Sequence, residues 1–307
     1  MKMFNEHAET ILGFIGLGAM GLPMAHNILK KGDETLLVYD VATGRAQRLA
    51  AHGALIAASP EELMRQADIL FLCLPTNALV AETLEKALEH LKPGAGVVDF
   101  SSTAPGILQA AHRAGQAKGL MVVDAPVSGG SWGAEAGSLT VMCGGDEAAF
   151  ARVSPYLNRV GTSVSHIGPT GAGDLTKIIN NMLVGIHLDA LAEGLALAKK
   201  AGLDPGRVFE AIRHGFAASA VMEAKAPLML SHDFEPRARL AVHLKDLDNA
   251  RDTAQALGVD IPLSLLTREH MAALCDQGFQ DLDQAAMIKG HEERMGVDIS
   301  KPGGINQ

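Results

Sequence analysis

Ile11-Leu-Gly-Phe-Ile-Gly-Leu-Gly-Ala-Met-Gly21 joins a short apolar run to a glycine-rich turn near the start of the chain. Glycine at positions 16, 18 and 21 permits a tight turn, the close approach of a pyrophosphate, and packing of a helix against a strand. We therefore expect a dinucleotide phosphate site at the N-terminal end of a helix that begins near Met20. The residues expected around it are Gly16, Leu17, Gly18, Ala19, Met20 and Gly21.

The choice of dinucleotide is indicated by Asp40, which lies nineteen residues after Gly21 at the end of a second apolar run. A carboxylate there accepts hydrogen bonds from both ribose hydroxyls of NAD and repels the 2′-phosphate of NADP. We expect NAD, with NADP less favoured, although the nearby Arg45 softens the preference. Ligands of open α/β sheets bind beyond the carboxyl ends of strands, so further cofactor contacts are expected there. These are Leu74, Pro75 and Ser102, for which plain turn residues are the alternative.

The first half of the chain alternates short β-rich runs with polar, alanine-rich segments such as Glu61–Ala67 and Leu79–Leu91. Nearly continuous apolar runs are typical of parallel strands buried on both faces. The expected strands are Ile11–Ile15, Thr35–Tyr39, Ala54–Ala57, Ile69–Leu74, Gly96–Phe100, Leu120–Asp124, Leu139–Gly144 and Ser163–Ile167. The pattern predicts an α/β Rossmann domain with a doubly wound, mostly parallel sheet.

After Gly173 only helical patterns remain, beginning with one long helix from Asp174 to about Ala201. We expect a Rossmann domain over residues 1–170 and an all-α C-terminal domain over 171–307, joined by this long interdomain helix. The further helices are expected at Pro205–His214, Ala220–Leu230, Val242–Leu257, Leu263–Gln277 and near Gln284–Glu293. Because the long helix is unusually apolar, we also expect it to pack against another subunit, in a homodimer or homotetramer.

The totals describe an ordinary globular protein: 307 residues, 48% hydrophobic, 20% charged, with a net charge of −9. The acidic balance argues against a nucleic-acid partner, and no apolar run approaches the roughly 18 residues needed to span a membrane. Three widely separated cysteines, Cys73, Cys143 and Cys275, indicate reduced thiols in a cytoplasmic protein. No His, Cys or Asp cluster has metal-ligand spacing, so no metal is expected.

The chemistry is expected in the run from Gly168 to Asn181, where a glycine-rich turn launches the long helix. Lys177 and Asn181 share one helix face, about 6 Å apart. The helix dipole disfavours a positive charge so early in a helix, which suits a lysine that exchanges a proton. A solvated surface lysine is the alternative for an isolated pair. Earlier in the chain, Ser128, Gly129 and Gly130 offer a hydroxyl and adjacent N–H groups to a substrate carboxylate, unless they form a plain loop.

These motifs, in this order, resemble the β-hydroxyacid dehydrogenase family, which includes 3-hydroxyisobutyrate dehydrogenase and tartronate semialdehyde (2-hydroxy-3-oxopropionate) reductase. The resemblance extends from Gly13 to about Met287 and includes the late Lys-Asp-Leu segment at Lys245. It implies that Lys177 is the catalytic acid/base and that Asn181 orients the substrate. It also implies that Ser128, Gly129 and Gly130 bind the substrate carboxylate and that Lys245 contacts the cofactor.

By this resemblance the chemistry is reversible hydride transfer between NAD and a short β-hydroxy acid or semialdehyde. The run Asp99–Pro105 and the segment after His243 look more like the tartronate semialdehyde reductase branch. Oxidation of 3-hydroxyisobutyrate or L-threonate stays open, as does a non-catalytic NAD-binding interaction protein. The chain is too short for a 6-phosphogluconate dehydrogenase, and Lys177 argues against an imine reductase. The effect of Trp132, next to the glycine pair, on the substrate site is left open.

Overall fold

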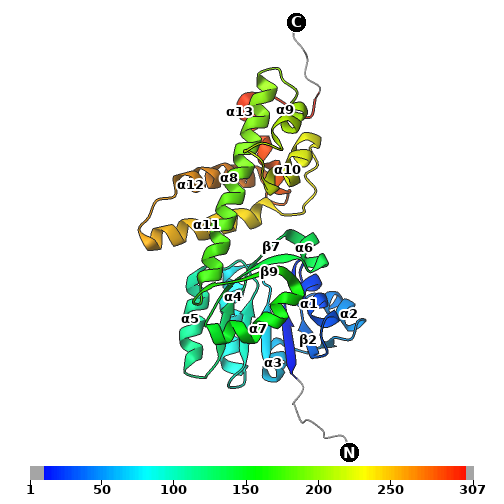
Figure 1. The fold of residues 1–307 in the computed structure, drawn as a ribbon, viewed down its shortest axis with the longest axis vertical. Coiled ribbons are helices and arrows are strands. Elements are labelled where there is room, and N and C mark those ends of the chain that lie inside the picture. Colours follow the sequence, from blue (N-terminus) through cyan, green and yellow to red (C-terminus); the bar gives the residue numbers. More distant parts are fainter. Residues whose placement is uncertain (1–9, 302–307) are drawn as a thin grey trace, which may run out of the picture. The chain divides into compact units, whose positions relative to one another are not determined.

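A computed structural model describes residues 10–301 of the chain. It divides into two units, residues 1–177 and residues 178–307, and the division falls within the longest helix, α8. Figure 1 shows the order of the elements along the chain. Each unit has its own core and is described by itself. The expected domain boundary at residues 170 and 171 stays a prediction.

The first unit is built on one twisted sheet in the strand order β3-β2-β1-β4-β5-β6-β8-β7, with β9 beside β8. Strands β1 to β6 run parallel, whereas β8 is antiparallel to β6 and β7. The order 3-2-1-4-5-6 is that of a doubly wound dinucleotide-binding fold, which confirms the predicted fold class. The strands are Ile11–Ile15 (β1), Thr35–Tyr39 (β2), Leu55–Ile56 (β3), Ile69–Leu72 (β4), Gly96–Asp99 (β5), Met121–Asp124 (β6), Val127–Ser128 (β7), Leu139–Gly144 (β8) and Gly161–Gly168 (β9).

Helices cover both faces of the sheet, so successive residues of a central strand enter opposite cores. In β4, Phe71 packs with Phe14 and Phe100 on the face covered by α1, α2 and α7, while Leu70 and Leu72 face α3, α4 and α5. This explains the nearly continuous apolar runs of the sequence. The helices are Gly21–Lys30 (α1), Thr43–Ala50 (α2), Pro60–Gln66 (α3), Asn77–His90 (α4), Pro105–Gln116 (α5), Gly130–Ala136 (α6) and Glu147–Val160 (α7).

The regular elements of the second unit are helices, apart from an isolated β-bridge between Arg239 and Asp283, and they pack around Leu188, Leu195, Met229, Met271 and Ile288. Asp204 and Ser219 begin α9 and α10 as N-caps whose side chains accept backbone N–H bonds. The elements are Ala172–Lys200 (α8), Pro205–Ile212 (α9), Ala220–Ser231 (α10), Leu240–Leu257 (α11), Pro262–Leu274 (α12), a π-turn at Cys275–Phe279 (η1), a 3₁₀ turn at Gln284–Ala286 (η2) and Met287–Met295 (α13).

Several expected bounds are off by one or two residues, and three local features differ more from the sequence-based expectations. The run after Asp124, expected as a loop, contains the two-residue strand β7 and the short helix α6. Helix α12 stops at Leu274 rather than Gln277, because Gly278 adopts a φ of 92° and the chain passes into a π-turn. Strand β3 is only two residues long, and both of its side chains are exposed.

Candidate active site

The glycine-rich turn after β1 is fixed by backbone contacts. Gly16 has a φ of +96°, and a Cβ on it would lie 2.3 Å from the carbonyl oxygen of Cys73. A Cβ on Gly21 would lie 1.9 Å from the carbonyl oxygen of Gly16, whereas one on Gly18 would meet nothing within 4 Å. Two glycines are therefore required by the turn itself. The third leaves open space where a pyrophosphate can approach the backbone.

Asp40 ties this turn to the end of β2. Its carboxylate accepts the N–H of Leu17 at 2.6 Å and that of Ala42 at 2.7 Å, and its side chain is nearly buried. The guanidinium of Arg45 lies 3.4 Å from the same carboxylate, with its side chain half exposed. Asp40 thus holds the phosphate turn in place, and the lone pairs that remain on its oxygens can receive ribose hydroxyls.

The carboxyl ends of β4 and β5 are joined by a buried polar network. The N–H of Leu74 donates to Ser101 Oγ at 2.8 Å. Asp99 in turn accepts the N–H of Ser101 at 2.9 Å and the hydroxyl of Thr103 at 3.0 Å. Burial raises the pKa of the Asp99 carboxyl to about 6, despite these hydrogen bonds. The network fixes the loops on which Leu74, Pro75 and Ser102 were predicted to meet the cofactor.

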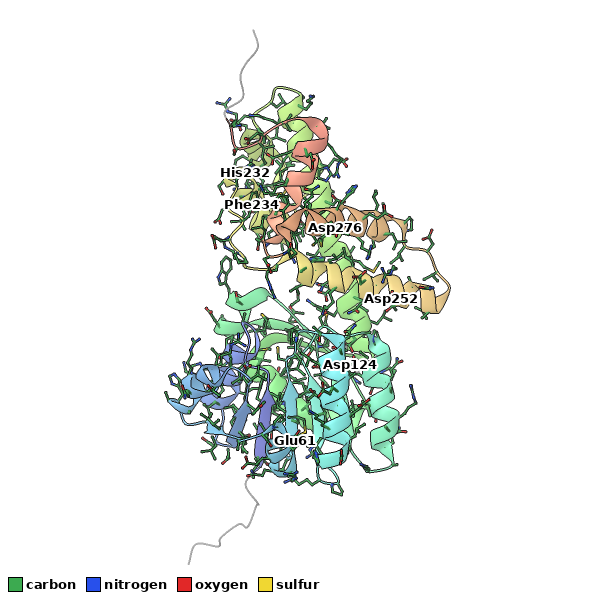
Figure 2. All side chains as sticks on the ribbon, turned by 180° about the vertical axis from the view of Figure 1, so that it is seen from behind. Glu61, Asp124, His232, Phe234, Asp252 and Asp276 are labelled. Atoms are coloured by element: carbon green, nitrogen blue, oxygen red, sulfur yellow. The ribbon has the colours of Figure 1, made fainter. Side chains whose placement is uncertain are left out.

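Asp124, which is labelled in Figure 2, lies at the end of β6 and anchors the start of α8 within the first unit. Its two carboxylate oxygens accept the N–H groups of Gly171 at 2.7 Å and Asp174 at 2.9 Å. A Cβ on Gly173 would lie 2.9 Å from the same carboxylate, so this position also requires glycine. Burial raises the pKa of Asp124, and the two N–H bonds oppose the rise. Gly171 and Gly173 therefore allow the first turn of α8 to pack against this carboxylate.

Ser128, Gly129 and Gly130 lie where β7 ends and α6 begins. Gly129 has a φ of 132° and Gly130 a φ of 64°, a backbone region that other residues rarely adopt. Both glycines are exposed, Ser128 is half buried, and Trp132 on α6 is 73% exposed. A turn of this kind can direct successive N–H groups toward one anion, as a nest does.

Lys177 and Asn181 lie one turn apart on α8, where Lys177 is half buried and Asn181 is buried. The amide nitrogen of Asn181 donates to Asp246 of α11 at 2.5 Å, and its amide oxygen accepts from Asn180 at 2.8 Å. Lys245 lies 3.0 Å from the second oxygen of Asp246. Asn181 is therefore held in one orientation by contacts at both ends of its amide group.

His243 of α11 secures the same asparagine from its backbone side. The ring Nε2 of this buried histidine lies 2.9 Å from the carbonyl oxygen of Asn181. The side-chain amide of Gln284 donates to His243 Nδ1 at 2.8 Å. Together these contacts assign a neutral ring with its proton on Nε2. Helix α11 thus positions Asn181 through two residues, His243 and Asp246.

Lys245 was predicted from the sequence as a site residue. Asp246, His243 and Gln284 in the second unit were not, nor were Asp99 and Ser101 in the first. Asp246 and His243 are three residues apart and share a helix face, while Asp99 closes an apolar strand. A polar residue at a buried position of an apolar pattern indicates a buried hydrogen bond, although the sequence does not say which residue is its partner.

Two family models match this chain in succession. The NAD binding domain of 6-phosphogluconate dehydrogenase matches residues 11–168, and the NAD-binding of NADP-dependent 3-hydroxyisobutyrate dehydrogenase matches residues 171–290. The 2-(hydroxymethyl)glutarate dehydrogenase of Eubacterium barkeri is 37% identical over 94% of this chain and 97% of that protein. The 2-hydroxy-3-oxopropionate reductase of Escherichia coli is 34% identical over 92% and 97%. The chain belongs to the β-hydroxyacid dehydrogenase family.

A solved structure supports the same assignment for the fold. The 3-hydroxyisobutyrate dehydrogenase of Mycobacterium tuberculosis with L-serine superposes with a TM-score of 0.85 at 31% identity, over 92% of this chain and 98% of that one. As a β-hydroxyacid dehydrogenase, the protein is an oxidoreductase that acts on CH–OH groups and binds a nicotinamide dinucleotide. The glycine turn and Asp40 suit that cofactor, because they leave open space for a pyrophosphate and acceptors for a ribose.

Helix α8 of this dehydrogenase is long and apolar enough to cross a membrane by length and composition, contrary to the expectation from the sequence. Half of its apolar window is buried within the protein, and the core helix of a soluble protein passes the same test. Since the matched relatives are dehydrogenases and reductases, we interpret α8 as such a core helix.

Proposed function

We propose that this β-hydroxyacid dehydrogenase is an NAD-dependent 2-hydroxy-3-oxopropionate (tartronate semialdehyde) reductase that interconverts its substrate with D-glycerate. The observation that carries the chemistry is the pair Lys177 and Asn181 on α8, with the amide of Asn181 fixed by Asp246 at 2.5 Å. The substrate is supported by the 34% identity to a 2-hydroxy-3-oxopropionate reductase over nearly the whole chain.

Each predicted site residue has a proposed role in this hydride transfer. Lys177 exchanges the proton, and Asn181 holds the reacting oxygen in line. Ser128, Gly129 and Gly130 bind the substrate carboxylate. The cofactor is held by the turn Gly16, Leu17, Gly18, Ala19, Met20 and Gly21, and by Asp40, Leu74, Pro75, Ser102 and Lys245.

NADH, when bound at the glycine turn, supplies the hydride for the aldehyde carbon of the substrate. Protonated Lys177 gives its proton to the aldehyde oxygen as the C=O bond becomes a C–O bond, so the product is a hydroxymethyl group. Neutral Lys177 then regains a proton from solvent. In the oxidative direction neutral Lys177 takes the hydroxyl proton. Asn181 donates its second amide hydrogen to the reacting oxygen and limits its movement.

A second substrate, 2-(hydroxymethyl)glutarate, is favoured by the 37% identity to a dehydrogenase of that name. D-Glycerate, 3-hydroxyisobutyrate and 2-(hydroxymethyl)glutarate share a hydroxymethyl group on the carbon beside a carboxylate. They differ only in the third substituent of that carbon. The proposed roles of Lys177, Asn181 and the carboxylate nest therefore apply to all three, and the residues around the variable substituent select among them.

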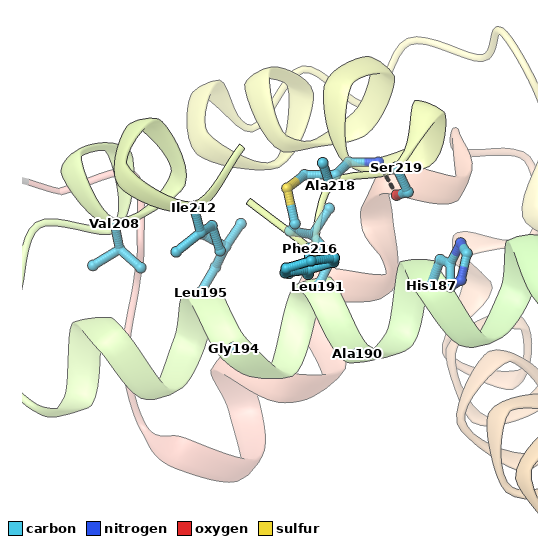
Figure 3. Close-up of a pocket in the computed structure, with 12 residues that line it drawn as sticks. His187, Ala190, Leu191, Gly194, Leu195, Val208, Ile212, Phe216, Ala218 and Ser219 are labelled. Atoms are coloured by element: carbon cyan, nitrogen blue, oxygen red, sulfur yellow. Dashed lines mark hydrogen bonds between the residues drawn. The ribbon is translucent and has the colours of Figure 1, made fainter. Parts of the chain in front are cut away.

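We also propose that the protein is a cytoplasmic homodimer or homotetramer. In the helical unit, α8, α9 and α10 line an apolar pocket of about 440 Å³ (Figure 3). Phe216 at this pocket is fully exposed, and Ile179 and Leu183 on α8 are each about half exposed. A second copy of the chain would cover such apolar surface. Light scattering on the purified protein tests this proposal, and a monomer at micromolar concentration would refute it.

The substrate proposal is tested by following NADH with a panel of acids and the matching semialdehydes. The panel contains D-glycerate, 2-(hydroxymethyl)glutarate, 3-hydroxyisobutyrate, L-threonate and L-serine, each with NAD and with NADP. We expect the highest kcat/KM for D-glycerate with NAD. A higher value for another acid would replace the substrate and keep the chemistry. NADH binding without turnover on any member would refute the proposed catalysis.

The role of Lys177 is tested by Lys177→Ala. We expect kcat to fall more than about 100-fold, because the alkoxide loses its proton donor, while the Kd for NADH changes less than about twofold. Lys200→Ala, which removes an exposed lysine at the far end of the same helix, is the matched control and should keep its kcat. Stopped-flow single turnovers and NADH fluorescence titration measure the two quantities. Retained turnover in Lys177→Ala would eliminate the lysine mechanism.

A further inference from the structure

Three helices of the second unit bring two histidines to one carboxylate. Asp189 lies on α8, His270 on α12 and His291 on α13. His270 Nδ1 lies 2.8 Å from one oxygen of Asp189, and His291 Nε2 lies 2.7 Å from the other. The ligand atoms of the three side chains all lie within 4.8 Å of one another. None of the three side chains belongs to the glycine-rich turn after β1 or to the pair Lys177 and Asn181.

Two of these side chains are buried, and solvent reaches the cluster mainly from the side of His270. The side chain of His291 is 2% exposed and that of Asp189 is 10% exposed, whereas His270 is 24% exposed. An anion in a helical core requires a compensating charge. Either protons on the histidines or a bound cation can provide it.

The donor set is that of a transition-metal site. Zn²⁺ binds imidazole nitrogens and carboxylate oxygens at about 2.0–2.2 Å in tetrahedral geometry, so two neighbouring ligand atoms on one ion lie about 3.4 Å apart. The two nitrogen–oxygen distances here, 2.8 and 2.7 Å, are hydrogen-bond lengths, so each histidine has to move away from Asp189 by a little over half an ångström (about 0.6 Å) to admit the ion. Two nitrogens and a carboxylate leave at least one position for water, and the exposed edge of His270 provides access.

We propose that Asp189, His270 and His291 form a site for a late first-row transition-metal ion such as Zn²⁺, which cross-links α8, α12 and α13. Each histidine coordinates through the nitrogen that faces Asp189 and keeps its proton on the other ring nitrogen. The site is structural and independent of the proposed hydride transfer. Motif spacing does not show it, because the ligands come from helices up to 102 residues apart.

A second cluster in the same unit, His232, Glu292 and Asp298, is a poorer candidate and a useful control. His232 lies 3.9 Å from Asp298, which already pairs with Lys301 at 2.9 Å. Glu292 accepts the N–H of Ile299 at 2.7 Å in addition to His232. Its carboxylates are thus used by other donors, and we expect no tightly held metal there.

The test measures zinc bound by the full chain. The protein is stripped with EDTA, dialysed against micromolar Zn²⁺ and analysed for metal. We expect one ion per chain in the unsubstituted protein and none in the double variant His270→Gln/His291→Gln. Glutamine can still donate hydrogen bonds to Asp189, so the variant can keep the contacts between the three helices but loses both imidazoles. His232→Gln is the matched control and should keep its ion.

Two further readouts separate ligation from folding. Zn²⁺ should raise the Tm of the unsubstituted protein and of His232→Gln, and leave that of the double variant unchanged. Co²⁺ in place of zinc should give visible ligand-field bands that the double variant lacks. The proposal is overturned if the unsubstituted protein retains no zinc after dialysis, if the double variant retains as much, or if His232→Gln loses its ion.

Discussion

The nucleotide-binding unit and the helical unit are specified in different ways. In the first, Gly16 and Gly21 have no room for a Cβ beside backbone oxygens, so a contiguous run of sequence determines the turn. In the second, Asn181 is placed by His243 and Asp246, more than sixty residues away. A local backbone constraint can be inferred from a motif. A contact between distant side chains becomes visible only once the helices have been packed.

The largest expected effect breaks the local constraint. Gly21→Ala places a Cβ 1.9 Å from the carbonyl oxygen of Gly16, so the turn must shift. We expect the free energy of unfolding to fall by about 3 kcal/mol and the NADH affinity to fall about 100-fold. Thermal unfolding and NADH fluorescence measure these changes.

Gly18→Ala is the matched control, because a Cβ there meets nothing within 4 Å. It should change the free energy of unfolding by less than about 0.5 kcal/mol and weaken only cofactor binding. Equal destabilisation by the two substitutions would contradict the distinction between a glycine that the turn requires and one that leaves space for the ligand.

A somewhat smaller effect is expected from the buried hydrogen-bond network around Asp99, which the motifs of the first unit do not predict. The pKa of Asp99 is raised from near 3.8 to about 6, so the folded state favours the protonated carboxyl. Its stabilising contribution is present below pH 4 and is lost as the pH rises to 6. The unsubstituted protein should therefore lose about 2 kcal/mol relative to Asp99→Asn across that interval. Denaturant unfolding at each pH measures the difference, and parallel profiles would contradict it.

The next effect tests the long-range network of the second unit. His243→Leu removes the donor to the Asn181 carbonyl and leaves the Gln284 amide without its acceptor. We expect the free energy of unfolding to fall by about 2 kcal/mol. Because Asn181 is then less firmly placed, kcat should fall about tenfold while the Kd for NADH is unchanged. His214→Leu removes an exposed histidine of the same unit. An equal loss of kcat in that control would show that His243 does not act through Asn181.

Much of the fold could be predicted from the sequence, because its determinants are local. The bounds of β1, β2 and β8 were predicted to the residue from apolar runs. Helix α6 was missed because its glycines are typical of a loop. The end of α12 was predicted at Gln277, just before Gly278, but the backbone changes to a π-turn at Cys275.

The candidate site was predictable only in part, for the same physical reason. Lys177, Asn181 and the Ser128–Gly130 run lie in motifs with their own spacing. Asp246 and His243 differ from solvated helix residues only through their partners, and the pairing of Asp189 with His291 spans 102 residues. Such pairs are fixed by helix packing, which the pattern of a single helix does not encode.

The smallest expected effect concerns Arg45, which lies beside Asp40 at the expected cofactor site. Arg45 is half exposed and lies 3.4 Å from Asp40, so its ion pair contributes little to stability. If Arg45 receives the 2′-phosphate of NADP, Arg45→Ala should lower kcat/KM for NADP about fivefold, or about 1 kcal/mol, and leave the value for NAD unchanged. Initial rates with both cofactors measure this. A loss that is equal for NAD and NADP would mean that Arg45 acts through Asp40 and the glycine turn, so that cofactor choice is a property of the local motif alone.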